Sequence, residues 1–229
     1  QVTLAPGGRV ETIAFNFGGA TGTRRLYGCD GVNAEFEFDG DVLVPLSTGM
    51  TNKASFVAAH RNYLWYAYGS SLQKSSIGSP YVWSAVLGAA EIAVGDDITG
   101  MAASPGNQDT SSLTVTCSNS TYVLYGSTSA DFKLDRISDE AGAMAYSLKT
   151  VGQPLGYDAQ GFRVIKPTQS FGNFQWDSAS RKIDSLVRGK TPVCSVFTPT
   201  LSRYRCFFSD GSVLSGTPGV GAAPGAAAA

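Results

Sequence analysis

Short apolar and aromatic runs, each ended by turn-forming residues, recur along the whole chain and restrict the folds it can adopt. The clearest runs are Ala34–Phe38, Tyr63–Tyr68, Leu113–Cys117, Tyr122–Tyr125, Phe162–Ile165, Val193–Phe197 and Tyr204–Phe208. Runs of this kind, rich in tyrosine, phenylalanine and valine, are typical of β-strands. Helical pattern is confined to one short turn near Ser178–Leu186. The sequence therefore predicts an all-β fold.

The turns between these runs also share a style. Three runs end in Phe38-Asp39-Gly40, Tyr125-Gly126-Ser127 and Ser209-Asp210-Gly211. An Asp-Gly pair supplies the positive φ angles that a two-residue hairpin turn needs. We therefore expect neighbouring runs to pair as antiparallel hairpins.

A loose internal repeat favours one all-β architecture. Four runs occupy matching places in this repeat: Tyr63–Tyr68, Tyr122–Tyr125, Phe162–Ile165 and Tyr204–Phe208. The last three runs are separated by roughly forty residues, which is the length of a propeller blade. Ser55–Ala59 and Leu113–Cys117 each precede a short turn and a second strand, so both are interpreted as first strands of a unit. The prediction is a β-propeller-like meander of four-stranded blades over residues 1–215, closed or incomplete, with a β-sandwich as the alternative.

Strand alternation in the run at residues 63–68 supports inner-blade packing. Tyr63, Trp65 and Ala67 would lie on one face, and the other face would carry Leu64, Tyr66 and Tyr68. Both faces are then apolar, as expected of a strand packed between two neighbouring blades.

Composition and charge limit the partners of the chain. Only 15% of the 229 residues are charged, and the formal net charge is −1. Because phosphate neutralisation needs clustered lysine and arginine, tight electrostatic binding to nucleic acid is not expected. No stretch is long and apolar enough for a transmembrane span, so we expect no membrane insertion.

The ends of the chain carry their own expectations. The chain begins at Gln1 without a methionine or a signal-like segment, so we expect it to be part of a longer protein. Residues 216–229 form a Gly/Ala/Pro tail without an apolar period, interpreted as unstructured or as linker.

The four cysteines are too far apart for a CxxC metal clip: Cys29, Cys117, Cys194 and Cys206. A hairpin turning at Thr198–Leu201 could bring Cys194 opposite Cys206, so a cross-strand disulfide and buried free thiols both stay open. No metal site and no cofactor is predicted.

A search for catalytic groups finds no convincing constellation. His60 is the only histidine and follows an apolar run, so a structural role is expected. Gly189-Lys190-Thr191 lacks the upstream glycine of a phosphate-binding loop, and Ser209-Asp210-Gly211-Ser212 is interpreted as a turn. Two acidic clusters could supply a calcium site or an acid pair, or serve as loop caps and inter-subunit ion pairs: Glu91, Asp96 and Asp97, and Asp135, Asp139 and Glu140. The prediction is a protein without catalytic residues.

A series of segments resembles a known group of viral proteins. The segments are Ser76–Ala85, Gly88–Gly100, Tyr122–Gly126, Ser138–Ala143 and Gln169–Phe174, within about residues 27–214. Together they are similar to the propeller-bearing tail-tube, nozzle or packaged-DNA-stabilising proteins of short-tailed bacteriophages. Members of that group are usually much longer than this chain.

The resemblance implies a structural virion component, not an enzyme. It would form a ring of six copies in the tail, below the portal and adaptor, retaining packaged genomic DNA and conducting it during ejection. Partners would be further copies, and adaptor, needle or fibre proteins. The alternatives are a receptor- or glycan-binding propeller at the tail tip, with Trp65, Tyr81 or Trp83 stacking on sugar rings, and a glycan-cleaving propeller using Glu91, Asp97 or Asp139.

Ring formation requires two different surface patches that meet between subunits. Exposed aromatic loops with nearby acidic residues would suit such a contact. The candidate inter-subunit contact is Tyr81 and Trp83 together with Glu91, Asp96 and Asp97.

Overall fold

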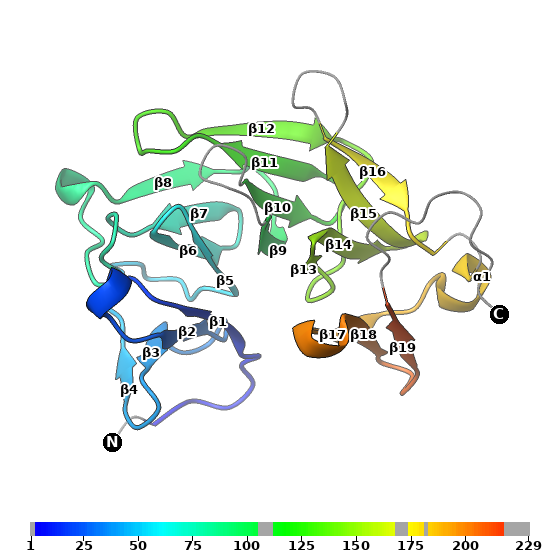
Figure 1. Ribbon diagram of the computed structural model, residues 1–229, viewed down its shortest axis with the longest axis horizontal. Coiled ribbons are helices and arrows are strands. Elements are labelled where there is room, and N and C mark those ends of the chain that lie inside the picture. Colours follow the sequence, from blue (N-terminus) through cyan, green and yellow to red (C-terminus); the bar gives the residue numbers. More distant parts are fainter. Residues whose placement is uncertain (1–2, 105–111, 168–173, 181–182, 218–229) are drawn as a thin grey trace.

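The chain forms a five-bladed β-propeller. The computed structural model describes residues 3–104, 112–167, 174–180 and 183–217. These residues form five small antiparallel sheets, each of which follows the order of the chain as a meander (Figure 1). The predicted all-β propeller is confirmed, and the sandwich alternative is not formed. The predicted tail at residues 216–229 falls mostly outside the described residues.

Each of the first four blades has four strands, as predicted. Blade 1 contains β1 (Glu11–Phe15), β2 (Arg25–Cys29), β3 (Phe36–Phe38) and β4 (Leu43–Pro45). Blade 2 contains β5 (Phe56–His60), β6 (Tyr63–Tyr68), β7 (Ser71–Lys74) and β8 (Ala90–Ala93). Blade 3 contains β9 (Ile98–Ala103), β10 (Leu113–Cys117), β11 (Thr121–Tyr125) and β12 (Lys133–Ser138). Blade 4 contains β13 (Lys149–Val151), β14 (Gln153–Asp158), β15 (Gly161–Pro167) and β16 (Phe174–Ser178).

Blade 5 departs from the four-strand prediction. Within the described residues it contains three strands, β17 (Pro192–Thr198), β18 (Arg203–Phe208) and β19 (Val213–Gly216). The one α-helix of the described chain, α1 (Asp184–Val187), precedes this blade and matches the short helical turn predicted near Ser178–Leu186. Three short 3-10 turns, η1 (Gly19–Thr21), η2 (Ala85–Leu87) and η3 (Pro199–Leu201), lie in loops.

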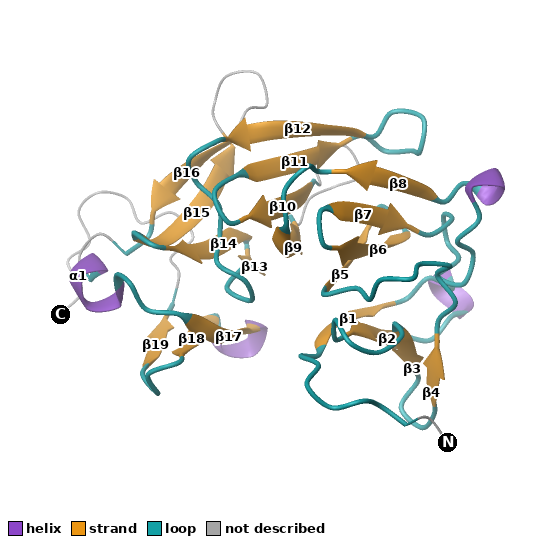
Figure 2. Cartoon of the chain, turned by 180° about the vertical axis from the view of Figure 1, so that it is seen from behind, coloured by secondary structure: helices purple, strands orange, loops and turns teal. Residues whose placement is uncertain are grey.

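The blades follow one another around an arc, with blades 1 and 5 at its ends (Figures 1 and 2). The innermost strands β1, β5, β9, β13 and β17 contact their neighbours in this order. Among the described residues, β17 and β1 make no comparable contact. The two terminal blades therefore each have one sheet face that no other blade covers.

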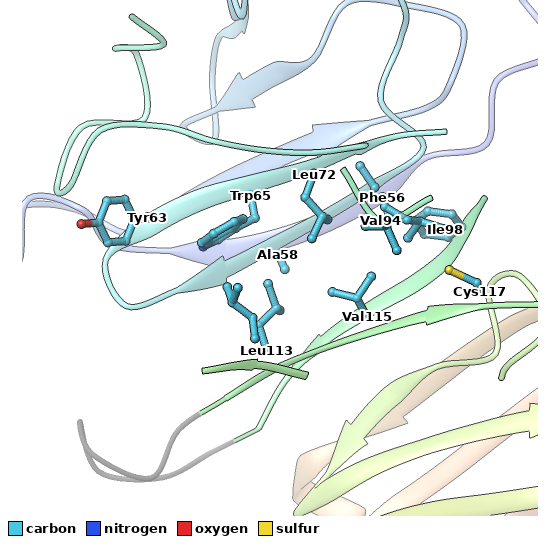
Figure 3. Close-up of a cluster of buried hydrophobic side chains, with 12 residues drawn as sticks. Phe56, Ala58, Tyr63, Trp65, Leu72, Val94, Ile98, Leu113, Val115 and Cys117 are labelled. Atoms are coloured by element: carbon cyan, nitrogen blue, oxygen red, sulfur yellow. The ribbon is translucent and has the colours of Figure 1, made fainter. Parts of the chain in front are cut away.

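Blade 2 is packed on both faces, as the alternation in its second strand predicts. All six side chains of β6 are buried. Tyr63, Trp65 and Ala67 join a cluster with Leu113 and Val115 of blade 3 (Figure 3). On the opposite face, residues 64, 66 and 68 join a cluster with Tyr27 and Cys29 of blade 1. This apolar sandwich fixes the first three blades relative to one another.

The contact between blades 3 and 4 is more polar. Thr99 Oγ1 donates to the carbonyl of Ala143 over 2.6 Å, and Thr121 Oγ1 donates to Ala141 over 2.7 Å. Thr150 Oγ1 donates to Ala103 over 2.8 Å. The first two bonds tie carbonyl groups of the segment between β12 and β13 to blade 3, and the third joins β13 of blade 4 to β9 of blade 3.

Blades 4 and 5 share a third apolar cluster. Tyr157 and Phe162 of blade 4 pack against Tyr204, Cys206 and Phe208 of blade 5. The Tyr157 hydroxyl donates to the carbonyl of Val187, which attaches α1 to the same interface.

The predicted repeat has the right length but the wrong phase. Tyr63–Tyr68 and Tyr204–Phe208 belong to second strands, whereas Tyr122–Tyr125 and Phe162–Ile165 belong to third strands. Leu113–Cys117, interpreted as a first strand, is the second strand of blade 3. The error arises because second strands such as β6 and third strands such as β11 are both largely buried and contain tyrosines, so residue type alone does not separate them.

The turns confirm the hairpins but not all of their predicted lengths. The two-residue turn between β5 and β6 is Arg61-Asn62, whose φ angles are +54° and +61°. The turns with Asp39-Gly40 and Asp210-Gly211 are longer, and in each the aspartate accepts hydrogen bonds from backbone N–H groups two or three residues ahead. Both glycines have positive φ, as expected.

The cysteine alternatives are resolved in favour of free thiols. Cys206 pairs in register with Ser195, and Cys194 pairs with Phe207, after a shift of register between Pro192 and Cys194. Cys194 and Cys206 therefore lie on opposite faces of blade 5, and both are free. The turn predicted at Thr198–Leu201 is confirmed as η3.

Candidate functional site

The residues predicted as an inter-subunit contact do not form one patch. Tyr81 and Trp83 lie in the loop between β7 and β8, which is hydrogen-bonded to the Arg61-Asn62 turn through Gly78. Asp96 and Asp97 lie in the loop between β8 and β9, next to the Gly69 turn. Because these two turns are at opposite ends of β6, the aromatic and acidic pairs are on opposite faces of the propeller. Their contact role stays a prediction.

The acidic members have local partners. Glu91 is exposed on β8 and accepts a hydrogen bond from Ser71 Oγ of the neighbouring strand β7. Asp96 accepts from its own neighbour, the N–H of Asp97, and lies 3.4 Å from Ser120 Oγ. The second acidic cluster is also engaged, since Asp135 pairs with Lys133 and Asp139 with Arg136. These four acids therefore have partners within the chain, and their role in ion pairs between subunits stays a prediction.

Of the three aromatic residues considered for sugar stacking, one is well exposed. Trp65 is 0% exposed in the cluster between blades 2 and 3. Trp83 is half-buried on the Tyr66 ring at a centroid distance of 5.6 Å, and its Nε1 donates to the carbonyl of Pro80. Tyr81 is 53% exposed. A stacking role is therefore possible only at Tyr81 without rearrangement of the core.

Tyr81 belongs to a polar cluster that the sequence did not reveal. Its hydroxyl donates to Glu37 Oε2 over 2.5 Å, and Glu37 also pairs with Arg25. Glu37 is only 3% exposed, and Tyr27, beside it, is 2% exposed. Burial is the main reason why the pKa of Tyr27 lies far above its ordinary value, and the Glu37 carboxylate adds to this rise. The cluster joins blade 1 to the loop of blade 2.

A pocket of about 340 Å³ opens beside this cluster. Its walls come from the glycine-rich η1 turn of blade 1 and from the β7–β8 loop of blade 2. The signals that could have indicated it are Arg25 directly after a glycine-rich segment and Glu37 inside an apolar strand. Their pairing across two strands with a tyrosine from another blade was not predictable from spacing.

A second cavity, of about 270 Å³, lies among the innermost strands β1, β5, β9 and β13. Its walls include the Glu11–Lys149 ion pair, at 2.9 Å, which connects blade 1 directly to blade 4. Arg9 also stacks on the Tyr146 ring, with its guanidinium carbon 3.5 Å from the centroid. This volume is below the usual ~300–1,000 Å³ of small-molecule pockets, so the cavity is small even for a compact ligand.

Two buried basic groups are part of the packing. Lys74, 1% exposed, donates to Gly88 O and to Ser129 Oγ and lies 4.3 Å from the Tyr63 ring centroid. Burial lowers its pKa. His60 is 3% exposed, and its Nε2 has no hydrogen-bond partner among the described residues. Burial first, and the charge of Arg61 second, lower the pKa of His60 to about 4.

Within the described ranges, no group of three or more His, Cys, Asp or Glu side chains is placed to hold a metal ion. The helices of the same ranges include none that is long and apolar enough to cross a membrane. No model of a known protein family matches the chain, and a search of curated proteins finds no similar sequence. The fold and the geometry of its surfaces therefore carry the functional argument.

Proposed function

We propose that this chain is a structural subunit of the tail of a short-tailed bacteriophage. In this proposal several copies, six in the predicted ring, surround the DNA channel, retain the packaged genome and conduct it during ejection. The chain acts as a rigid wall element and performs no chemistry. Its support is the series of segments that resembles tail nozzle proteins, together with the distribution of apolar surface described next.

The observation that carries the proposal is the uncovered apolar face at each end of the blade series. On blade 5, Val196, Phe207 and Val213 lie opposite the face that packs on blade 4, and they are 46%, 37% and 50% exposed. On blade 1, Leu26 and Phe38 are half-buried on the face opposite blade 2. Among the described residues, blades 3 and 4 contribute no exposed large apolar side chain. Exposed apolar side chains thus lie on both terminal blades. Blade 2 also carries some, in its β7–β8 loop, where Val86 is 93% exposed.

The two ends also differ in charge. Residues 11–45 carry six acidic and two basic side chains, a net −4, and residues 184–216 carry four basic and two acidic side chains, a net +2. Complementary charge favours contact between unlike ends over contact between like ends. A contact between blade 5 of one copy and blade 1 of the next is heterologous, and such contacts close into rings when the rotation between subunits allows it.

The DNA channel in this proposal is enclosed by the ring of subunits. The central cavity of a single propeller, at about 270 Å³, is too small for DNA. A formal net charge of −1 gives the channel wall little attraction for phosphate, so DNA would be guided without being held tightly.

The oligomeric state of purified wild-type protein and of two variants tests the proposal. Sedimentation velocity should show a ring-sized species for the wild type and dissociation for Phe207→Asp, because a charge would be buried in the contact. The control is Val86→Asp, in a loop of blade 2 where the side chain is 93% exposed. A wild type that stays monomeric at all concentrations, or a Phe207→Asp variant that assembles normally while folded, contradicts the proposed contact.

A further inference from the structure

The pocket between blades 1 and 2 has the features of a built binding site. It is formed by the η1 turn with Thr21 and Thr23, by Arg25 on β2, and by Pro80 and Tyr81 of the β7–β8 loop. Its volume of about 340 Å³ falls within the range of small-ligand pockets.

The glycine-rich wall is held in one conformation by an asparagine side chain. Asn16 Nδ2 donates to the carbonyls of Gly19 and Gly22, and its Oδ1 accepts from the N–H of Gly18. Gly18 and Gly22 approach so closely that a Cβ added at Gly22 would lie 2.5 Å from the Cα of Gly18. A wall fixed in this way needs little ordering when a ligand binds.

A buried carboxylate beside the pocket orients two of the lining side chains. Glu37 accepts from Arg25 Nη1 and from the Tyr81 hydroxyl. Within the described residues the hydrogen bonds of Arg25 all run through Nη1, which leaves Nε and Nη2 for a bound molecule. The guanidinium is therefore held in place at Nη1, and its Nε and Nη2 edge can donate to a molecule in the pocket.

Charge in the pocket disfavours an anionic ligand. Arg25 is the one basic side chain among the lining residues, and Glu37 neutralises it. The lining residues include no acidic side chain, and the Arg25 charge is balanced by its ion pair, so the pocket suits an uncharged ligand.

We propose that this pocket binds a neutral sugar ring. The exposed face of Tyr81 packs against the apolar C–H face of the ring, as aromatic side chains with a polar tip do at wet interfaces. Arg25 Nε and Nη2 and the hydroxyls of Thr21 and Thr23 bond to the sugar hydroxyls. A single ring offers about a dozen heavy atoms, so its dissociation constant is on the order of 1 mM. This inference does not depend on the proposed tail role.

Saturation-transfer NMR on the whole chain tests the proposal. The probes are glucose, galactose, N-acetylglucosamine and rhamnose, with inorganic phosphate as the anionic probe. At least one sugar should bind the wild type, and Tyr81→Ala should weaken it about tenfold or more. Tyr81→Phe keeps the ring and should retain most of the affinity. Val86→Ala, in the same loop but outside the pocket, should bind like the wild type.

Melting curves of all variants verify that they are folded. The proposal is overturned if none of the four sugars binds, if phosphate binds in preference to them, or if folded Tyr81→Ala binds sugar as the wild type does.

Discussion

His60 should make the stability of the protein decrease as the pH falls from about 6.5 to about 4. It is the only histidine of the chain. Its pKa is lowered from 6.5 to about 4 in the folded state, mainly by burial. Below pH 6.5 the unfolded chain therefore binds a proton that the folded chain does not bind, and stability decreases as the pH falls.

The size of the effect follows from that difference in pKa. Each pH unit within the window removes up to ~1.4 kcal/mol, so the total loss between pH 6.5 and about 4 is ~3 kcal/mol. That is a large share of the ~5–15 kcal/mol by which proteins of this kind are stable.

Urea unfolding of the wild type and of His60→Leu, at neutral pH and near the lower end of the window, measures this loss. In His60→Leu the free energy of unfolding should lack most of the decrease that the wild type shows between these two pH values. Aspartates such as Asp131, whose pKa is lowered by hydrogen bonds from Thr128, contribute equally to both proteins and cancel in the comparison. An identical decrease in the two proteins would refute the assignment to His60.

Three further predictions concern packing and thiol access. Leu113→Ala, at a fully buried position between blades 2 and 3, should lower the free energy of unfolding by ~2–5 kcal/mol in urea titrations, whereas Leu186→Ala, at a position 70% exposed, should change it by less than ~0.5 kcal/mol. Gly142→Ala should lower the free energy of unfolding by ~1–3 kcal/mol, because the new Cβ would lie 2.1 Å from the carbonyl oxygen of Cys117. The control is Gly216→Ala, whose Cβ meets nothing within 4 Å and should leave the free energy of unfolding unchanged. In the native protein a thiol reagent should modify Cys194 first, because the other three cysteines are buried. All four cysteines should react in denaturant. Early reaction of Cys29 would contradict the packing of blade 1 on blade 2.

The strands and their alternation could be predicted from the sequence because they depend on local pattern. The run Tyr63–Tyr68 is β6 residue for residue, and its two apolar faces are the two blade contacts. The phase of the repeat was not predictable in the same way. The connections between strands vary from the single residue Gly152, between β13 and β14, to the long segment between β7 and β8, so equal spacing does not mark equivalent strands.

The candidate site is formed by contacts between blades, and the local pattern of residues along the sequence does not predict such contacts. Tyr81 was singled out by its type, but its partners Arg25 and Glu37 belong to another blade. Asp96 and Asp97 are near Tyr81 in the sequence, yet a single strand between their loops places them on the other face of the propeller. The three-dimensional pairing of loops, and not their order, decides which residues share a surface.

Imaging of the assembled phage tail by cryo-electron microscopy tests the central claim most directly. The proposed function predicts density for this five-bladed propeller repeated in a ring around the DNA channel, with blade 5 of each copy against blade 1 of the next. Density for the propeller only in peripheral fibres, or its absence from the particle, would contradict the claim.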